Sequence, residues 1–367
     1  MGDRKRPLRI LEIGEDSLFK RSMPEETTLI FTGASRRSVE GLEYRSFGPT
    51  MVPGLLRSLK RGEWDIVFCF PPARPVLDTR RAIFGLPAAL SRVLFRFRTL
   101  GTYVARTRYP IPLVVLDLND MITVPRPALK LLDLSIAYFK RDLPRDPGKA
   151  LFDVVPQFRT PKKVMSSKFL LRNVDKFHPI SAGVSDDTVR LALATGSQKS
   201  VDIFFAGRIN SIIRQRGFEQ LEALARSGYS VDICQGGLSK TEYLERCARA
   251  WLTWSPEGFG WGDCFRDFEA SLCLSVPVMS PSNVMRFRPL LDGVHTFIYP
   301  LEGNGLSAVV RRALQDKVAL AAMARNARQH VLSHHTHARI CEHLLDTALD
   351  CMKTRGYANG DRTFAQS

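Results

Sequence analysis

Between residues 201 and 300, short runs of β-branched and aromatic residues alternate with longer segments of helical period. We expect strands at residues 201–207, 229–234, 251–254, 276–280 and 295–301, and helices at 218–228, at 239–250 and after Asp263. Regular alternation of this kind is typical of strand–helix–strand units stacked around a parallel sheet. After this region, residues from 306 to about 352 are expected to be nearly all helical.

The first half of the 367-residue chain is long enough for a second domain. Strands are expected there at residues 8–14, 27–33, 64–70, 113–118 and 134–139, whereas the Pro-, Lys- and Arg-rich segment 144–168 is expected to form a loop. With a linker at 194–200, we predict an N-terminal domain at 1–193, a C-terminal domain at 194–345, and a helix end and tail at 346–367. The predicted fold is therefore α/β, with two Rossmann-like, doubly wound domains that face a cleft at the carboxyl ends of their strands.

The charge of the chain narrows its partners. Lys and Arg number 53 against 37 Asp and Glu, which gives a formal net charge of +16. Such an excess favours phosphate-bearing ligands, nucleic acid or an anionic membrane face. The sequence has neither a basic tail nor the interleaved basic and aromatic residues of a nucleic-acid module, so we expect no nucleic-acid partner.

The sequence also indicates a compartment. Its seven cysteines have no CxxC spacing and mostly lie in apolar runs, which favours reduced thiols. The first apolar run has only the length of a strand, so no signal peptide is expected, and no run approaches the roughly 18 apolar residues of a membrane span. We predict a cytoplasmic protein that at most contacts the inner membrane face peripherally.

Residues 255–280, SPEGFGWGDCFRDFEASLCLSVPVMS, are the most informative segment. A glycine-rich loop follows an expected strand, and Asp263 suits the N-cap of the next helix. Glycines let the backbone approach a ligand closely, and the free N–H groups of a helix start favour an anion such as phosphate. This segment therefore predicts an anion site.

Two charged residues of the same helix are candidates to bind one ligand. Arg266 and Glu269 are three residues apart and share a face, while Phe265, Phe268 and Leu272 are expected to face the core. A guanidinium suits phosphate oxygens, and a carboxylate can accept hydrogen bonds from the two ribose hydroxyls. The alternative is an ordinary surface ion pair.

Segment 255–280 resembles the nucleotide-sugar segment of glycosyltransferases with the two-Rossmann, B-type fold, especially their group-1-like and exostosin-like branches. The resemblance implies that Glu269 binds the donor ribose and that the preceding loop lies against the sugar and diphosphate. The loop residues that match are Gly258, Phe259 and Gly260, with Glu257 aligned only loosely.

Two positions depart from that family pattern. Trp261 stands where the larger group-1 branch has a second glutamate, and Ser275 stands where the turn before the next strand usually has glycine. The first difference leaves Glu269 as the one glutamate that this motif supplies.

A second match lies in residues 204–224, FFAGRINSIIRQRGFEQLEAL, which resemble the motif in which two basic residues grip the donor diphosphate. Gly207 and Arg208 match directly. The usual lysine is replaced by Arg216, or by Arg214 if the exostosin-like spacing applies. Basic residues around a strand–helix turn can neutralise a diphosphate leaving group, although isolated arginines are more often solvated surface residues.

The N-terminal half offers weaker candidates. Asp117 and Asp120 follow the expected strand at 113–118, and Asp120 is our candidate for the base that takes the acceptor's proton; the alternative is a loop-capping aspartate. After the next strand, Lys140 and Arg141 resemble an exostosin-like F-K-R element, which implies contact with donor phosphates or an anionic acceptor. Solvated basic side chains are the alternative.

The C-terminal segment 330–345 resembles the closing helix that crosses back onto the first domain in B-type enzymes. It contains five histidines, and a helix-surface cluster is a better interpretation than a metal site because neither an acidic residue nor a cysteine completes a zinc spacing. These are His330, His334, His335, His337 and His343.

Residues 80–108 mix apolar residues with seven arginines. A basic amphipathic segment can lie on an anionic membrane surface, which would suit a lipid-linked acceptor. The more ordinary alternative is a Rossmann helix that buries its apolar side.

Taken together, the residues and the resemblance predict a metal-independent glycosyltransferase, with a nucleotide sugar as cosubstrate and no cofactor. Its acceptor is expected to be a glycan or lipid-linked glycan in cell-surface polysaccharide synthesis. The alternative is a non-catalytic, basic binding protein with the same fold that holds an anionic polymer or membrane surface.

Overall fold

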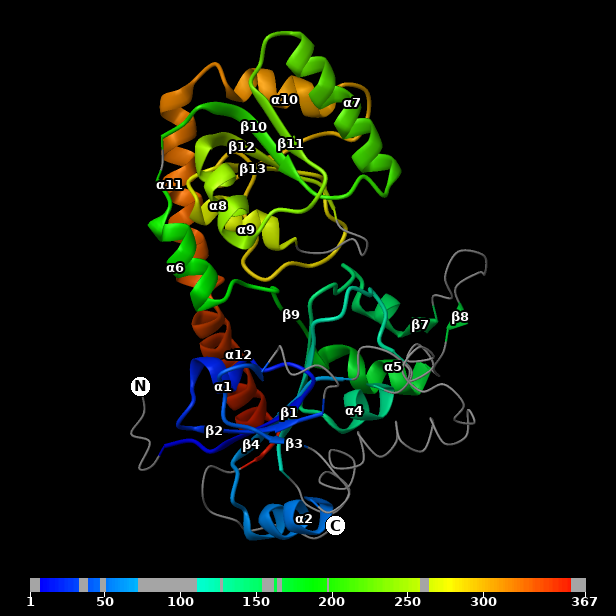
Figure 1. Cartoon of the computed structure of the whole chain (residues 1–367). Helices are drawn as coiled ribbons and strands as arrows, with labels where there is room; N and C mark the ends of the chain where they lie inside the picture. Colours follow the sequence, from blue (N-terminus) through cyan, green and yellow to red (C-terminus); the bar gives the residue numbers. More distant parts are fainter. Residues whose placement is uncertain are drawn as a thin grey trace, which may run out of the picture.

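A computed structural model describes residues 7–32, 39–46, 51–71, 111–125, 128–153, 162–163, 167–196, 198–257 and 264–357. Within these residues the chain forms two parallel sheets, each with helices on both faces (Figure 1). The segment 80–108, which raised the question of a membrane surface, lies outside the described residues. So do Gly258, Phe259, Gly260 and Asp263 of the predicted anion-binding loop.

The first sheet has the order β3-β2-β1-β4-β5-β6-β9 in the described part of the chain, and every neighbouring pair is parallel. Its strands are β1 (Ile10–Gly14), β2 (Thr27–Phe31), β3 (Arg45–Ser46), β4 (Ile66–Cys69), β5 (Leu113–Asp117), β6 (Ala137–Lys140) and β9 (Phe177–Pro179). The five strands expected from the sequence are all present. The two that were not expected, β3 and β9, are two and three residues long and lie at the edges of the sheet.

Both faces of this sheet are covered. One core cluster joins alternate strand residues to α2 (Val52–Arg61) and α4 (Leu129–Leu134), and a second joins the other strand residues to α1 (Phe19–Ser22) and α12 (His337–Thr354). Such two-sided burial explains why these strands read as continuous apolar runs. The predicted loop 144–168 contains more structure than expected: a 3₁₀ helix (Pro147–Leu151), a short antiparallel pair, β7 (Phe152–Asp153) and β8 (Lys162–Lys163), and the start of α5 (Ser167–Asn173).

The second sheet has the order β11-β10-β12-β13-β14 among the described residues and is also parallel throughout. Its strands are β10 (Val201–Ala206), β11 (Val231–Cys234), β12 (Ala250–Ser255), β13 (Val276–Met279) and β14 (Phe297–Ile298). Its helices are α6 (Asp186–Ala194), α7 (Ile212–Arg226), α8 (Lys240–Arg249), α9 (Phe265–Leu272), α10 (Gly305–Ala313) and α11 (Lys317–His334). α7 and α10 pack on one face and α8 and α9 on the other.

The last helix joins the two halves of the molecule. α12 continues from α11 and packs its apolar side, including Ile340 and Leu344, against the first sheet (Figure 1). This confirms the predicted doubly wound α/β fold with a C-terminal helix that crosses back. No helix of the described ranges is long and apolar enough to span a bilayer.

The two halves also meet through the loops that follow β6 and β13. Met285 donates its backbone N–H to the Leu143 carbonyl at 2.7 Å, and Pro144 forms an antiparallel bridge with Val284. Arg145 adds a side-chain hydrogen bond to the Ser282 carbonyl at 3.2 Å. Because both loops leave the carboxyl ends of their strands, this junction brings the carboxyl edges of the two sheets together.

The histidine cluster lies at the turn between α11 and α12, and its predicted surface position is wrong for His335. The His335 side chain is 1% exposed and stacks on Phe268, with ring centroids 4.4 Å apart. Its Nε2 lies 2.9 Å from the Arg288 carbonyl oxygen, which His330 also contacts. Among the described residues, no three His, Cys, Asp or Glu side chains are placed to hold a metal ion.

Because the His335 side chain is buried, we expect the stability of the folded protein to decrease at acid pH. Burial lowers the pKa of His335 to about 3, against an ordinary 6.5, so the unfolded chain binds a proton that the folded chain does not. Stability is therefore lost as the pH falls below about 6.5. His335→Phe, which keeps an aromatic ring, should reduce the loss of unfolding free energy between pH 7 and pH 5 by about 2 kcal/mol in urea titrations. His334→Phe is the control, and an equal effect of both changes would contradict the assignment.

Candidate nucleotide-sugar site

Two of the predicted donor residues, Gly207 and Arg266, meet where strand β10 ends. Arg266, on α9, donates from Nη2 to the Ala206 carbonyl at the end of β10 (2.7 Å), and its guanidinium lies 5.4 Å from the centre of the Phe205 ring. A methyl group on Gly207 would lie 3.0 Å from Arg266 Nη2. Glycine at 207 therefore leaves room for the arginine beside the strand end.

Helix α9 differs slightly from the sequence expectation. It begins at Phe265, and Cys264 rather than Asp263 occupies the N-cap position, without a side-chain capping bond. Phe268 and Leu272 face the core as expected, but Phe265 is 50% exposed, so its predicted core position is wrong.

Arg214 connects two loops at this edge. It is buried, and its Nε donates to the Glu257 carbonyl (3.1 Å) while Nη1 donates to the Arg208 carbonyl (2.9 Å) and to Asn210 Oδ1 (3.2 Å). Burial lowers the pKa of Arg214, and the positive charge of Arg266 lowers it further. Two largely buried guanidinium groups are thus held close enough to repel each other, an arrangement that an anion between them would stabilise.

Glu269 is buried on the same helix as Arg266, and its Oε1 forms an ion pair with Lys240 Nζ. Burial raises the pKa of the Tyr243 phenol, Glu269 raises it further and Arg266 opposes this shift, which shows that both charged groups lie near one ring. The structure thus brings Arg266 and Glu269 to the same site.

Lys240 was missed by the sequence analysis. It is the first residue of α8, directly after the N-cap Ser239, which forms a capping box with Glu242, and its side chain remains 45% exposed. The segment SKTE after strand β11 is a recognisable helix start, but nothing local indicates a partner 29 residues away.

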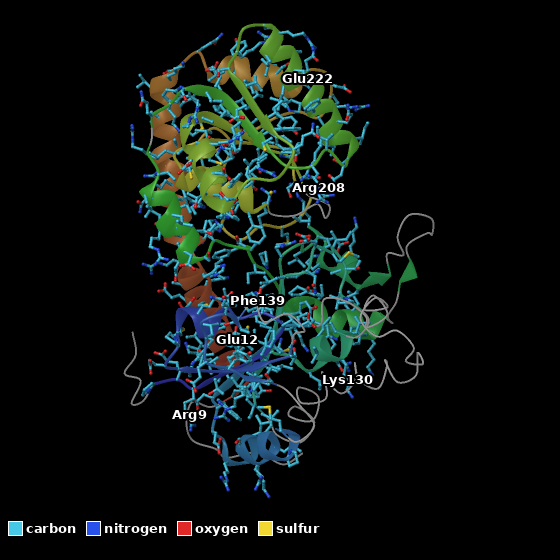
Figure 2. The ribbon with its side chains drawn as sticks, viewed as in Figure 1. Arg9, Glu12, Lys130, Phe139, Arg208 and Glu222 are labelled. Atoms are coloured by element: carbon cyan, nitrogen blue, oxygen red, sulfur yellow. The ribbon has the colours of Figure 1, made fainter. Side chains whose placement is uncertain are left out.

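The remaining predicted arginines are exposed. Figure 2 shows Arg208 on the side of the second domain that faces the first, whereas Glu222 lies on the opposite side. Arg216 is exposed on α7, two residues beyond the buried Arg214. Of the two alternatives for the second basic position, Arg214 is the one in contact with the loops at the strand ends.

Glu257 and Arg286 belong to the same edge. The Glu257 backbone N–H donates to Ser280 Oγ (2.9 Å), which ties the loops after β12 and β13 together. Burial raises the pKa of the Glu257 carboxyl, while the Arg286 guanidinium opposes this shift. Arg286 Nη1 also lies 3.7 Å from Asp267 Oδ2. Neither Arg286 nor Asp267 was singled out by the sequence analysis.

In the first domain, three of the candidates are already paired. Lys140 is fully buried and its Nζ lies 3.1 Å from Asp117 Oδ2, which also accepts a hydrogen bond from the Tyr138 hydroxyl (2.8 Å). Asn119 binds the other oxygen of Asp117. This pair neutralises the Lys140 charge within the domain, so we do not include Lys140 in the donor site. Arg141 is buried and forms an ion pair with Asp120, whose side chain is 67% exposed.

No family model and no curated protein sequence matches the chain. Solved structures do match. HepE from Anabaena in complex with UDP is 13% identical, with 94% of this chain and 100% of that chain covered and a TM-score of 0.53. An alpha-glucosyltransferase in complex with UDP and a 13-mer DNA is 10% identical (94% and 100% covered, TM-score 0.57), and the lipopolysaccharide outer core galactosyltransferase WaaB is 11% identical (94% and 99% covered, TM-score 0.52).

At these identities the likeness concerns the fold. Because it covers nearly the whole length of both chains in each comparison, the protein has the two-domain architecture of B-type glycosyltransferases. This agrees with the resemblance of segments 204–224 and 255–280. Assignment to the exostosin-like branch and the division of the chain at residues 194–200 stay predictions.

Proposed function

We propose that this protein is a glycosyltransferase that takes its sugar from a nucleoside diphosphate donor bound at the carboxyl edge of the second sheet. The observation that carries the proposal is the pair Arg214 and Arg266, two largely buried guanidinium groups that lie near each other at the end of β10. A diphosphate would offset their repulsion and could accept hydrogen bonds from both.

The neighbouring side chains complete this assignment. Glu269 would accept hydrogen bonds from the ribose hydroxyls through the carboxylate that Lys240 now engages at Oε1. Arg208, exposed on the side that faces the first domain, would contact the diphosphate from the solvent side. As the bond to the sugar breaks, the arginines would stabilise the charge that develops on the leaving diphosphate. The helix start at Phe265 adds backbone N–H groups on the same side.

The fold comparison supports the donor class, since HepE and the alpha-glucosyltransferase were both solved with UDP. We further propose that the acceptor is a glycan or a lipid-linked glycan held by the first domain, and that charge neutralisation by arginine makes a divalent ion unnecessary. Addition of a chelator should then leave nucleotide binding unchanged. A cytoplasmic location, with contact at the inner membrane face, fits such an acceptor.

Two substitutions should separate the contacts to the diphosphate from those to the ribose. Arg208→Ala should weaken UDP binding about 10-fold and leave uridine binding unchanged, because Arg208 would contact phosphate oxygens alone. Glu269→Gln should weaken UDP and uridine alike by about 10-fold. Isothermal titration calorimetry with a panel of nucleoside diphosphates would first identify the base and then measure both variants.

The controls are Arg226→Ala and Glu222→Gln, both exposed on α7 away from the site. Equal losses of UDP and uridine binding in Arg208→Ala would contradict the role given to Arg208. If no nucleotide bound while polyanions bound in a salt-sensitive manner, the data would instead favour a basic binding protein that uses the net charge of +16.

A further inference from the structure

The loop after β6 holds a buried carboxylate whose oxygens lack a hydrogen-bond partner among the described residues. Asp142 follows Lys140 and Arg141 at the carboxyl end of the strand, and its side chain is 0% exposed. Neither oxygen accepts a hydrogen bond from the described residues; Arg141 Nε lies 3.6 Å from Oδ1, too far for one. Such a group is costly to bury, and in a site for hydroxyl-bearing ligands its two acceptors would be available for a ligand.

Charged residues of both domains converge near this carboxylate. In the first domain, Arg141 lies between Asp120 and Asp142. In the second, Arg286 contacts Asp267 and acts on Glu257. The negative charge of Asp142 raises the pKa of Glu257, so these two carboxyl groups lie near each other across the domain junction.

This position is adjacent to the proposed donor site. The Glu257 carbonyl accepts a hydrogen bond from Arg214 Nε. Glu257, whose pKa is raised by the charge of Asp142, therefore also contacts an arginine that we assign to the diphosphate. Asp142 directly precedes Leu143, whose carbonyl accepts the Met285 N–H at the junction, and its side chain is fully buried from bulk water. A larger acceptor would reach it when the loops part, as domain movements in two-domain proteins allow.

The electrostatic surroundings suit a proton acceptor. Burial raises the pKa of Asp142, the Arg141 and Lys140 charges lower it, and the Asp117 charge raises it again. A carboxylate with a raised pKa is a better base than an ordinary aspartate.

We propose, on the basis of the proposed transferase function, that Asp142 is the catalytic residue that accepts the proton of the acceptor hydroxyl. In this step the hydroxyl oxygen forms a bond to the anomeric carbon of the donor sugar and its proton moves to the Asp142 carboxylate. The bond between that carbon and the diphosphate oxygen breaks, and its electron pair leaves with the diphosphate beside Arg214 and Arg266.

This assignment replaces Asp120, the candidate base from the sequence. The Asp120 side chain is 67% exposed and is paired with Arg141, so its charge is partly neutralised and its surroundings are aqueous. Asp120 and Asp142 are both partners of the same arginine. The variants Asp120→Asn and Asp142→Asn therefore remove the same charge from Arg141 and form a matched pair.

The test uses water as the acceptor. The full-length protein and both variants would be assayed for hydrolysis of UDP-glucose, UDP-galactose, ADP-glucose and GDP-mannose, with binding of the matching nucleoside diphosphate measured by calorimetry. Asp142→Asn should lower the hydrolysis rate by about 100-fold or more and leave nucleotide affinity unchanged, whereas Asp120→Asn should change the rate less than about 3-fold.

The pH dependence of the hydrolysis rate distinguishes a catalytic role of Asp142 from a purely structural one. The wild-type rate should fall on the acid side as Asp142 is protonated, and this limb should be missing in the residual activity of Asp142→Asn. The other charged groups that face Asp142 remain in both proteins: Arg141, Lys140 and Asp117 from the first domain, and Glu257 from the second. Thermal unfolding of Asp142→Asn should be no lower than that of wild type, because the change removes a buried charge.

The outcomes distinguish the two proposals. If the wild type binds no nucleoside diphosphate, the proposed function fails. If it binds one but hydrolyses none of the four donors, or if Asp142→Asn hydrolyses the donor as fast as wild type, the role of Asp142 is overturned while the donor site stands. Equal losses in Asp120→Asn and Asp142→Asn would also overturn it, since they would point to Arg141 instead.

Discussion

Gly217→Ala is expected to lower the free energy of unfolding by about 3 kcal/mol, near the upper end for an overpacked core. Gly217 lies on α7 where the helix crosses β12, and a methyl group there would overlap Cζ2 of Trp254 and lie 2.5 Å from Cη2. Trp254 is fully buried, and its Nε1 donates a hydrogen bond to the Tyr299 hydroxyl, so the indole cannot move aside freely. Urea titration followed by circular dichroism measures the effect.

Gly54→Ala is the matched control. Gly54 is also helical, on α2, but apart from its chain neighbours and the helix's own backbone no atom of the described residues lies within 4 Å of the position that a methyl group would take. Alanine there should stabilise the protein by about 0.5–1 kcal/mol, because glycine is the poorer helix former. If Gly217→Ala were as harmless as Gly54→Ala, close packing of α7 on Trp254 could not be the reason for glycine in the Arg-x-Arg-Gly segment.

The sequence predicted the strands well wherever both faces are buried. β5 and β12 are strands of five and six residues that are buried along most of their length, and both were located to within one or two residues. β3 and β9 were missed because strands of two or three residues carry no periodicity. Their place at the sheet edges is set by the strands beside them.

The candidate site was predictable where its parts share a short segment. Arg266 and Glu269 are three residues apart on one helix, so their spacing alone indicates a common face. Lys240 and Arg286 were not predictable, because their partners Glu269 and Asp267 are distant in the sequence. Pairing of this kind depends on how α8, α9 and the loop after β13 pack around the second sheet.

Contacts between residues distant in the sequence also explain why the burial of charged residues in the first domain was not predicted. In the segment YFKRD, three consecutive charged residues look like a solvated surface, yet Lys140, Arg141 and Asp142 are all buried. Lys140 is inside because the preceding strand β5 ends in Asp117, which neutralises it. Asp142 is also fully buried, and the next residue, Leu143, accepts a hydrogen bond from Met285 in the loop after β13. Neither contact can be identified from local composition, so the sequence analysis did not single out Asp142.

Lys199 lies in the segment 194–200, which has the composition of a linker, yet its side chain contacts several elements of the second domain. Residues 194–200 read as a flexible connection, but Lys199 Nζ donates hydrogen bonds to the carbonyls of Ala248 (2.9 Å), Ala250 (2.7 Å) and Leu274 (2.7 Å). These carbonyls belong to the end of α8, the start of β12 and the turn after α9. The Lys199 ammonium group thus uses all three of its donors to connect a helix, a strand and a turn of the second domain.

Lys199→Met is therefore expected to destabilise the second domain by about 3 kcal/mol, because the side chain keeps its length but leaves three carbonyls without this donor. Urea titration monitored by tryptophan fluorescence is a suitable measurement, since Trp251 and Trp254 both lie in β12. Lys168→Met, at an exposed position on α5, is the control and should change the free energy of unfolding by less than about 0.5 kcal/mol. Equal stability of the two variants would mean that solvent replaces the lysine at these carbonyls and that the segment is a simple linker after all.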